Sequence, residues 1–533
     1  MNSIDDLFGR LEQLNDIGAA LSSERDIARL LEKILLAAKT ITHADGGTLY
    51  RVSEDRQALR FEIFHNDTLG IALGGTSGNP INFPDLPLQN TQGEPNISMV
   101  AAFAVIHGRT VNIADAYDAA GFDFSGTRNF DAQTGYRSQS FLTVPMKNHE
   151  GMIIGVLQLI NSKHPKTGKV QAFTLAEERL AESLASQAAI ALTNRQLVSQ
   201  LEALFESFIQ LINLAIDEKS PYTGGHCQRV PTLTMMIAEA VNATREGPLA
   251  GFSLSEADIY ELKIAGLLHD CGKVTTPVHV VDKATKLQTI YDRIGLIDTR
   301  FEVLKRDAQI ATLRKLLELR PKQDVATEAT CWEDYREDLQ RLDDDRTFLR
   351  QVNVGSEVMS NDDQQRVRDI ATTRTWRNPE GVDADFLTAD EIENLTIRSG
   401  TLTSREREII NHHIVATIRM LEALPWPKHL EKVPEYAGGH HERVDGKGYP
   451  RGLTREQMSV PARMMAIADI FEALTARDRP YKSGMKLSEA LSIMHRFASN
   501  GHIDPDVFAA FLQQGVFRRY AEAFLDPEQI DKD

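Results

Sequence analysis

The stretch GGHHERVDGKGYP, residues 438–450, places two histidines side by side in a segment with four glycines. Glycine has no Cβ and adopts backbone conformations that other residues avoid, so the segment predicts a tight loop. In such a loop two adjacent imidazoles can turn toward one metal ion without needing helical spacing. His440 and His441 are therefore candidate metal ligands, and further ligands are expected elsewhere in the chain.

Several other histidines and acids interrupt apolar, helix-like segments. His269 and Asp270 end ELKIAGLLHD, and Asp469 lies within RMMAIADIFEAL. His413 lies on the inward face of a predicted helix, whereas His412 does not. An isolated buried carboxylate costs several kcal/mol unless something compensates its charge, so buried acids need partners. Taken singly, an inward histidine is usually a core residue, and Asp469 can equally cap a helix or pair with an arginine.

Taken together, these residues favour a metal centre. The candidates are five histidines and two aspartates: His226, His269, His413, His440, His441, Asp270 and Asp469. Mixed imidazole and carboxylate ligation suits Mn, Fe, Ni, Co or Zn, and the set exceeds what one ion needs. A shared carboxylate such as Asp270 can bridge two ions about 3.5–4 Å apart.

The bulk composition indicates an ordinary globular protein of 533 residues, long enough for two or three domains. Its formal charge of −17 disfavours nonspecific binding to nucleic acid, and an anionic substrate must meet a locally basic pocket. Three cysteines cannot build a disulfide framework and indicate a reducing compartment. The segment MNSIDDLFGRLEQL lacks the basic and apolar regions of a signal peptide, and no apolar run could cross a bilayer. We expect a cytoplasmic protein without a membrane span.

Residues 1–172 are predicted to form a mixed α and β domain. DIARLLEKILLAAKTI has helical periodicity, and GGTLYRV and LRFEIF are strand-like. SFLTVPMKN and GMIIGVLQLINSK are expected to pair as a hairpin. The stretch from Thr76 to Gly135, rich in Gly, Asn, Asp and Pro, predicts long loops that can cover a ligand.

Residues 173–216 predict a connecting helix. Its apolar residues alternate in steps of four and three along a coiled-coil seam, namely Leu197, Leu201, Leu204, Phe208, Leu211 and Ala215. Parallel dimerisation follows if this seam faces a second copy, although a helix buried against its own domain gives a similar pattern. Residues 217–533 are almost wholly helical in pattern, with a charged insertion at about 290–400. That insertion is either solvated decoration, a lid or a docking surface.

The C-terminal motifs resemble those of HD-GYP phosphodiesterases, a branch of the HD superfamily. HDCGK at 269–273, HHERVDGKGYP at 440–450 and DIFEALTARDRPYK at 469–482 match its signatures, and PYTGGHCQRV at 221–230 matches the start of the domain. The resemblance implies an all-α metal-dependent domain that hydrolyses cyclic di-GMP to the linear dinucleotide pGpG or on to GMP. It also implies two divalent ions, with Fe or Mn favoured over Ni, Co or Zn.

The resemblance also assigns roles to single residues. His269, Asp270, His413, His440, His441 and Asp469 match the family's metal ligands. His226 matches a ligand found mainly in members with a third metal, and those members carry glutamate where this chain has Tyr222. The catalytic centre is expected to include Asp270 and Lys273. The expected substrate-binding residues are Lys273, Arg479, Lys482, Tyr449, Gly448 and Pro450. Lys273 and metal-bound water are both candidates for protonating the leaving oxygen.

The N-terminal domain resembles a GAF sensor module with an antiparallel sheet. Asn161, Lys163, Phe173, Glu177 and Glu178 come close to the NKFDE pattern of cyclic-nucleotide GAF domains. The resemblance implies regulation by this domain and a cyclic nucleotide as one candidate ligand, although GAF folds host many ligands. Two alternatives remain for the C-terminal domain: a hydrolase of hybrid cyclic GMP-AMP, or a catalytically silent receptor for cyclic dinucleotides.

Overall fold

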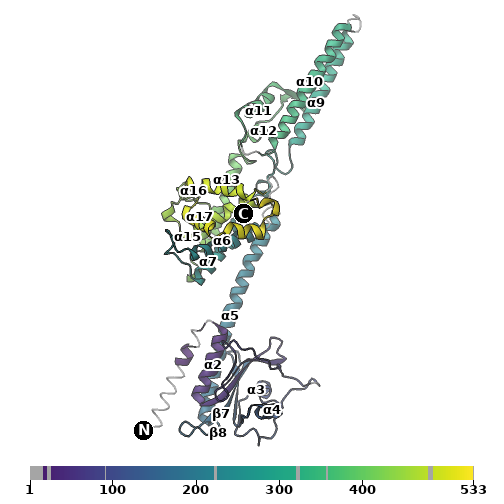
Figure 1. Cartoon of the computed structure of the whole chain (residues 1–533). Coiled ribbons are helices and arrows are strands. Elements are labelled where there is room, and N and C mark those ends of the chain that lie inside the picture. Colours follow the sequence, from purple (N-terminus) through teal and green to yellow (C-terminus); the bar gives the residue numbers. More distant parts are fainter. Residues whose placement is uncertain are drawn as a thin grey trace. The chain divides into compact units, whose positions relative to one another are not determined.

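The computed structural model describes residues 16–20, 24, 26–90, 92–220, 225–319, 325–355, 358–477 and 484–531. The chain divides into two compact units, residues 1–205 and 206–533. Helix α5 (Leu175–Lys219) supplies residues to both units (Figure 1).

An antiparallel sheet forms the centre of the N-terminal unit (Figure 1). Its strands follow the order β3-β2-β1-β7-β6-β5, with β4 paired to β2 and β8 paired to β7. The elements before α5 are, in chain order, α2 (Ile27–Thr42), β1 (Ala44–Val52), β2 (Ala58–Asn66), β3 (Ile71–Gly74), β4 (Leu86–Pro87), α3 (Val100–His107), β5 (Val111–Ile113), α4 (Ser125–Thr134), β6 (Phe141–Lys147), β7 (Ile153–Lys163) and β8 (Val170–Gln171). The predicted α and β unit with an antiparallel sheet is confirmed.

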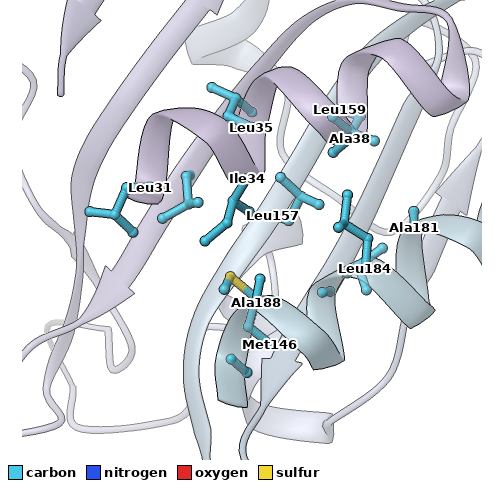
Figure 2. Packing of buried hydrophobic residues seen from close by; sticks show 14 of the residues in the cluster. Leu31, Ile34, Leu35, Ala38, Met146, Leu157, Leu159, Ala181, Leu184 and Ala188 are labelled. Carbon is cyan, nitrogen blue, oxygen red and sulfur yellow. The ribbon is translucent and has the colours of Figure 1, made fainter. Parts of the chain in front are cut away.

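Helix α2 covers one face of this sheet because its apolar residues recur with helical period. Asp26 caps the helix by accepting a hydrogen bond from the backbone N–H of Arg29 at 2.8 Å. Figure 2 shows the inward side chains of α2 beside those of β7, β6 and the first turns of α5, among them Leu31, Ile34, Leu35, Ala38, Leu157, Met146, Ala181, Leu184 and Ala188. The start of α5 is therefore part of the core of the N-terminal unit.

The opposite face of the sheet is covered by the stretch that the sequence predicts as long loops. Two helices, α3 and α4, and two short strands lie between Thr76 and Gly135, so the prediction of loops alone is wrong. Helix α3 packs on β6 and β7 through Ala101, which is buried with Tyr50 and Val156. The predicted hairpin of β6 and β7 is confirmed.

The C-terminal unit is largely helical, as predicted (Figure 1). After α5 its elements are α6 (His226–Ala243), α7 (Glu256–Leu268), η1 (Cys271–Thr275), α8 (Val278–Val281), α9 (Ile294–Leu319), α10 (Val325–Asn353), α11 (Asn361–Thr373), β9 (Thr375–Arg377), β10 (Asp383–Asp385), α12 (Ala389–Leu395), α13 (Ser404–Glu422), η3 (Lys428–Leu430), α14 (Val433–Gly438), η4 (Arg455–Gln457), α15 (Val460–Thr475), α16 (Leu487–Ser499), α17 (Pro505–Gln513), α18 (Val516–Phe524) and η5 (Pro527–Gln529). The two-stranded sheet of β9 and β10 is the exception to the all-α expectation. Among the described helices, none has the length and apolar character needed to cross a membrane.

The predicted insertion has a hydrophobic core of its own. Helices α9 and α10 run side by side as a long hairpin, and α11 and α12 pack near its base (Figure 1). Phe301 of α9, Phe348 of α10 and Phe386, which follows β10, are buried in this core. The outer part of the hairpin is therefore poor in apolar residues, as its sequence indicates, whereas the base of the hairpin is packed like a small domain.

Two buried lysines join the insertion to the rest of the C-terminal unit. Lys283 Nζ donates to Asn394 Oδ1 at 2.7 Å and to both carboxylate oxygens of Glu406. Lys286 Nζ donates to the backbone oxygens of Leu395 and Ile397 at 3.1 and 2.8 Å. Burial lowers the pKa of Lys286 to about 8. These bonds fix the start of the insertion against its end.

The second half of α5 carries an exposed apolar seam. The residues that the sequence assigns to the coiled-coil seam, from Leu197 to Leu211, are exposed in the single chain, and Leu201 is 65% exposed. A helix packed against its own unit would bury this seam, and here it stays open. The exposure favours the coiled-coil alternative of the sequence analysis.

Candidate metal centre

The seven candidate ligands come together from five segments of the C-terminal unit. His226 begins α6, His269 and Asp270 follow α7, and His413 lies in α13. His440 and His441 follow α14, and Asp469 lies in α15. Five of the seven, namely His226, His269, Asp270, His413 and His440, are buried.

One cluster consists of His226, His269 and Asp270. The Nε2 of His226 lies 3.0 Å from Asp270 Oδ2 and 3.4 Å from the Nε2 of His269. Asp469 approaches the same group, with its Oδ1 3.4 Å from His226 Nε2 and 4.0 Å from His269 Nε2. One donor atom each of His226, His269 and Asp270 lies within 4.8 Å of the other two, which is compatible with one metal ion.

A second cluster consists of His413, His440 and His441. The Nε2 atoms of His413 and His441 are 3.1 Å apart, and the rings of His440 and His441 are 4.1 Å apart. Their donor atoms also lie within 4.8 Å of one another. The adjacent histidines of the 438–450 loop therefore both face this group, as their spacing predicts.

Asp270 spans the two clusters. Its Oδ2 faces His226 and His269, at 3.0 and 3.2 Å, while its Oδ1 lies 3.3 Å from His413 Nε2. A carboxylate with one oxygen toward each set of imidazoles has the arrangement of a bridging ligand.

Backbone carbonyls orient the ligand rings. The Nδ1 atoms of His269 and His440 lie 2.7 and 2.6 Å from the carbonyl oxygens three residues earlier, those of Gly266 and Ala437. His413 Nδ1 makes the same contact with the carbonyl of Ile410. A ring that donates through Nδ1 presents the lone pair of Nε2, the usual state of a metal-ligating histidine. Rings held through Nδ1 in this way would direct the lone pair of Nε2 toward the centre.

The donor set fits divalent metal ions. His440 Nε2 and Asp270 Oδ1 are buried without a hydrogen-bond partner among the described residues. Two imidazole nitrogens bound to one ion at about 2.1 Å lie roughly 3.0–3.4 Å apart, and the Nε2 pairs at 3.1 and 3.4 Å match that separation. An ion in each cluster would give the unpartnered buried atoms a partner and would also account for the close nitrogen pairs.

Burial and neighbouring charges set the protonation states. Burial lowers the pKa of His441 to about 4 and that of His440 further below its usual range, so both imidazoles are neutral at pH 7. Burial alone would raise the pKa of Asp270, but Lys273 and His269 outweigh it and hold that carboxyl ionised. Neutral His440 and His441 beside an ionised Asp270 have the protonation states that metal binding requires. His226 differs: burial alone would lower its pKa, but Glu472 and Asp270 raise it to about 9, so a metal ion must displace a proton from this ring.

A close backbone contact brings the two clusters together. Gly272, directly after the His-Asp pair, lies against α13, and a Cβ there would lie 2.0 Å from the carbonyl oxygen of His413. Its N–H donates to Thr417 Oγ1 at 2.9 Å. Only glycine permits this approach, which sets Asp270 beside His413.

The sequence analysis missed three residues that support the ligands. Glu472 Oε2 lies 2.6 Å from His226 Nδ1, and Arg229 holds the other oxygen of Glu472 through its Nε at 2.8 Å. Glu442, buried next to His441, accepts hydrogen bonds from the N–H groups of Arg451 and Leu453 and thereby closes the glycine loop. A signal existed for Glu472, because it lies one helical turn after Asp469 within an apolar helix.

The residues expected to touch substrate are only partly described. Lys273 Nζ lies 2.5 Å from Asp270 Oδ2, and its side chain is partly exposed. Tyr449 stacks on His441 with ring centres 4.9 Å apart, and burial raises the pKa of its hydroxyl. Gly448 is packed against the backbone of Glu442, and Pro450 follows at the exposed edge of the loop. Arg479, Lys482 and Tyr222 lie outside the described residues.

Both units match known domain families. Residues 26–192 match the GAF domain, and residues 223–337 and 388–507 each match an HD domain. The gap between the two HD matches falls within the predicted insertion. Both resemblances drawn from the motifs are confirmed at the level of these domains.

Several relatives match over short segments. A cyclic di-GMP phosphodiesterase of Pseudomonas aeruginosa is 42% identical over 116 residues, which are 22% of this chain and 27% of the relative. A 3′3′-cGAMP-specific phosphodiesterase of Vibrio cholerae is 51% identical over 76 residues, 14% of this chain and 17% of the relative. A GAF domain of an Acinetobacter phosphoenolpyruvate-protein phosphotransferase is 17% identical, with 36% of this chain and 97% of that one covered and a TM-score of 0.27. The chain thus spans only about a quarter or less of the length of these two phosphodiesterases.

Proposed function

We propose that this chain, which joins a GAF domain to an HD domain, is a metal-dependent phosphodiesterase. Its proposed reaction is the hydrolysis of a cyclic dinucleotide, with cyclic di-GMP as the substrate. The observation that carries the proposal is the position of Asp270, which directs one oxygen toward each of two imidazole clusters. The identity to the Pseudomonas cyclic di-GMP phosphodiesterase supports the choice of substrate.

Two divalent ions would occupy the clusters, with Fe or Mn proposed and Ni, Co or Zn as alternatives that the same donors accept. His226, His269, Asp469 and one oxygen of Asp270 would hold the first; His413, His440, His441 and the other oxygen would hold the second. Such ions polarise a phosphoryl oxygen and lower the pKa of water from 15.7 to about 7. His226 is included because its Nε2 faces Asp270 and Asp469.

Hydrolysis would break one bond between phosphorus and a 3′ oxygen and leave a 5′ phosphate on the linear dinucleotide. A second hydrolysis would give two mononucleotides. Lys273 supplies positive charge for the phosphate oxygens: burial alone would lower its pKa, but Asp270 and Asp469 raise it above the ordinary value. A lysine held protonated beside the centre stabilises developing negative charge and can donate a proton to the leaving oxygen.

The 438–450 loop would form the wall of the substrate site. Tyr449 stacks on His441 and is only partly buried, so we propose that a base of the substrate stacks on its ring. Gly448 keeps the loop close to Glu442, which leaves no room for a side chain at that position. Arg479 and Lys482 are proposed to bind the substrate phosphates on the basis of the family motif alone.

The end of α5 offers a route for regulation. Lys219, the last residue of α5, donates through Nζ to the carbonyl oxygens of Lys273 and Val274 at 3.2 and 2.5 Å. A shift of this helix end would therefore displace the segment that carries Lys273. We propose that the GAF domain regulates hydrolysis through α5 and that two chains pair along its exposed seam.

A hybrid cyclic GMP-AMP is the second candidate substrate, favoured by the 51% identity to the Vibrio enzyme. Turnover of both dinucleotides, compared side by side with Fe- or Mn-loaded full-length protein, tests the proposal. Faster hydrolysis of cyclic di-GMP supports the proposal. Faster hydrolysis of the hybrid would make cyclic GMP-AMP the proposed substrate instead. If the protein binds both dinucleotides but hydrolyses neither when loaded with Fe, Mn, Ni, Co or Zn, it would instead be a catalytically silent receptor.

A further inference from the structure

The N-terminal unit contains a cavity that the proposed hydrolysis does not use. Its volume is about 410 Å³, which lies in the range of small-molecule sites. It lies on the face of the sheet opposite α2. The strands form one side of the cavity, and α3, α4 and the segment around Phe83 form the other. This position places it under the stretch from Thr76 to Gly135.

Aromatic rings in mutual contact form much of its wall. The ring centres of Tyr50 and Phe61 are 4.6 Å apart, and Phe61 is 5.3 Å from Phe83. Phe64 then lies 5.9 Å from Phe83 and 6.0 Å from Phe130. Five rings from two strands, a loop and α4 thus form a series of tilted, contacting aromatic groups, and a flat aromatic molecule can pack against their faces and edges.

The cavity offers no positive side chain. Among its described lining residues there is no Lys, Arg or His, and the one charged residue is Asp123. Lys163, the lysine of the NKFDE-like pattern, is not in the lining and pairs with Asp45. An anion taken into such a site would lose hydration without gaining a counter-charge, which disfavours its binding.

The N-terminus of α4, which faces the cavity, does not replace the missing cation. A free helix N-terminus attracts phosphate through its N–H groups. Here the carboxylate of Asp123 already accepts a hydrogen bond from the N–H of Ser125 at 2.8 Å, and this bond lowers the pKa of Asp123. The helix end therefore presents a negative side chain to the cavity.

The polar groups along the wall are largely used by the protein itself. The hydroxyl of Tyr50 donates to Gln158 Oε1 at 3.2 Å, and Gln158 Nε2 donates to Thr143. The hydroxyl of Tyr136 donates to Asp45 Oδ2 at 2.6 Å. Stacking and apolar burial, more than hydrogen bonding, are left to hold a ligand.

We infer that this cavity binds an uncharged, flat aromatic ligand and discriminates against phosphorylated nucleotides. The ring surface supplies the attraction, and a described lining without Lys, Arg or His supplies the discrimination. The ligand class therefore differs from the cyclic nucleotide that the NKFDE-like pattern suggests. The inference does not depend on the proposed hydrolysis.

A matched pair of fluorescent probes tests the inference on the full-length protein. N-phenylnaphthylamine is uncharged, and anilinonaphthalene sulfonate adds a sulfonate to the same ring system. The uncharged probe is expected to bind at least about tenfold more tightly than the sulfonate, and neither cyclic AMP nor cyclic GMP should displace it. Equal affinity for the two probes, or displacement by a cyclic nucleotide, would overturn the inference.

Three variants locate the binding and its charge preference. Phe130→Ala removes one ring of the wall and should weaken binding of the uncharged probe roughly three- to tenfold. Phe122→Ala is the matched control, because Phe122 contacts Phe103 and does not line the cavity. Ser125→Lys, at an exposed position on the rim, should tighten binding of the sulfonate while the uncharged probe still binds. Unchanged affinities in both Phe130→Ala and Ser125→Lys would show that the probes bind elsewhere and would refute the site.

Discussion

The Oε2 of Glu472 lies 2.6 Å from the Nδ1 of His226, although the two residues are 246 positions apart in the chain. Arg229 binds the other carboxylate oxygen. Burial alone would lower the pKa of His226, but Glu472 outweighs it and raises the value to about 9. The contact points the Nε2 of His226 toward Asp270 and Asp469, as a carboxylate behind a ligand histidine does in metal sites.

Substituting Glu472→Gln keeps the shape of this side chain and removes its charge. We expect the affinity for the first metal ion to fall about 10- to 100-fold, since the ring loses the partner that orients it. Metal titration followed by calorimetry measures the change. Glu456→Gln, at an exposed position in η4, is the control and should leave the affinity unchanged. Equal affinities in both variants would remove His226 from the ligand set.

Gly272→Ala tests the close contact between η1 and α13. The added Cβ would meet the carbonyl oxygen of His413 at 2.0 Å, so the two segments must separate. We expect a loss of on the order of 2–4 kcal/mol in unfolding free energy and weaker metal binding. Gly295→Ala in α9 is the control: its Cβ meets no atom within 4 Å, and helix propensity predicts a gain of up to about 1 kcal/mol. A well-tolerated Gly272→Ala with full metal content would contradict the packing.

Lys286→Met tests the buried ammonium that joins the insertion to its neighbours. Burial lowers the pKa of Lys286 from 10.5 to about 8, so the unfolded chain binds more protons between these values. The wild type therefore gains stability as the pH rises from about 8 to 10.5, whereas the variant lacks this gain. The melting-temperature difference, wild type minus variant, should increase over this window and stay flat below it. A difference independent of pH would show that Lys286 does not titrate in the folded state.

Leu204→Asp tests the proposed pairing along α5. A buried charge in a coiled-coil seam opposes association, so sedimentation should show a shift from dimer to monomer. Gln200→Asp introduces the same side chain at an exposed position outside the seam and should leave the dimer intact. A monomeric wild type, or a Leu204→Asp variant that still dimerises, would exclude this seam as the interface.

Local patterns sufficed for much of the fold and for singling out the histidines and acids that come together in the C-terminal unit. The periodicity of residues 26–41 predicted α2 to within a residue at each end, and the alternation of β6 and β7 predicted their hairpin. These candidate ligands could be singled out because buried histidines and acids in apolar helices require a compensating partner. The resemblance to the HD-GYP motifs then assigned these residues to a single metal centre.

Long-range packing was not predictable in the same way. Phe301, Phe348 and Phe386 form the core of the insertion, but each lies in a segment whose local composition is mostly polar. Helix α3 was missed because a short apolar helix between glycine-rich segments has no clear helical period. Glu472 and Arg229 become partners only once α15 and α6 pack together. Such contacts depend on the tertiary arrangement. An acid within an apolar helix singles out Glu472 locally, but its partner is not predictable from the sequence.

The proposed hydrolysis requires that Asp270 is a carboxylate shared by two divalent ions. The most direct test is the metal content of Asp270→Asn, measured with its turnover of cyclic di-GMP and compared with Asp258→Asn, a half-buried position in the first turn of α7. The expected result is about two ions per chain in the wild type and the control, fewer than one in Asp270→Asn, and a loss of turnover of roughly a thousandfold or more. An Asp270→Asn protein that keeps both ions, or hydrolyses the substrate at the wild-type rate after chelation, would contradict the account.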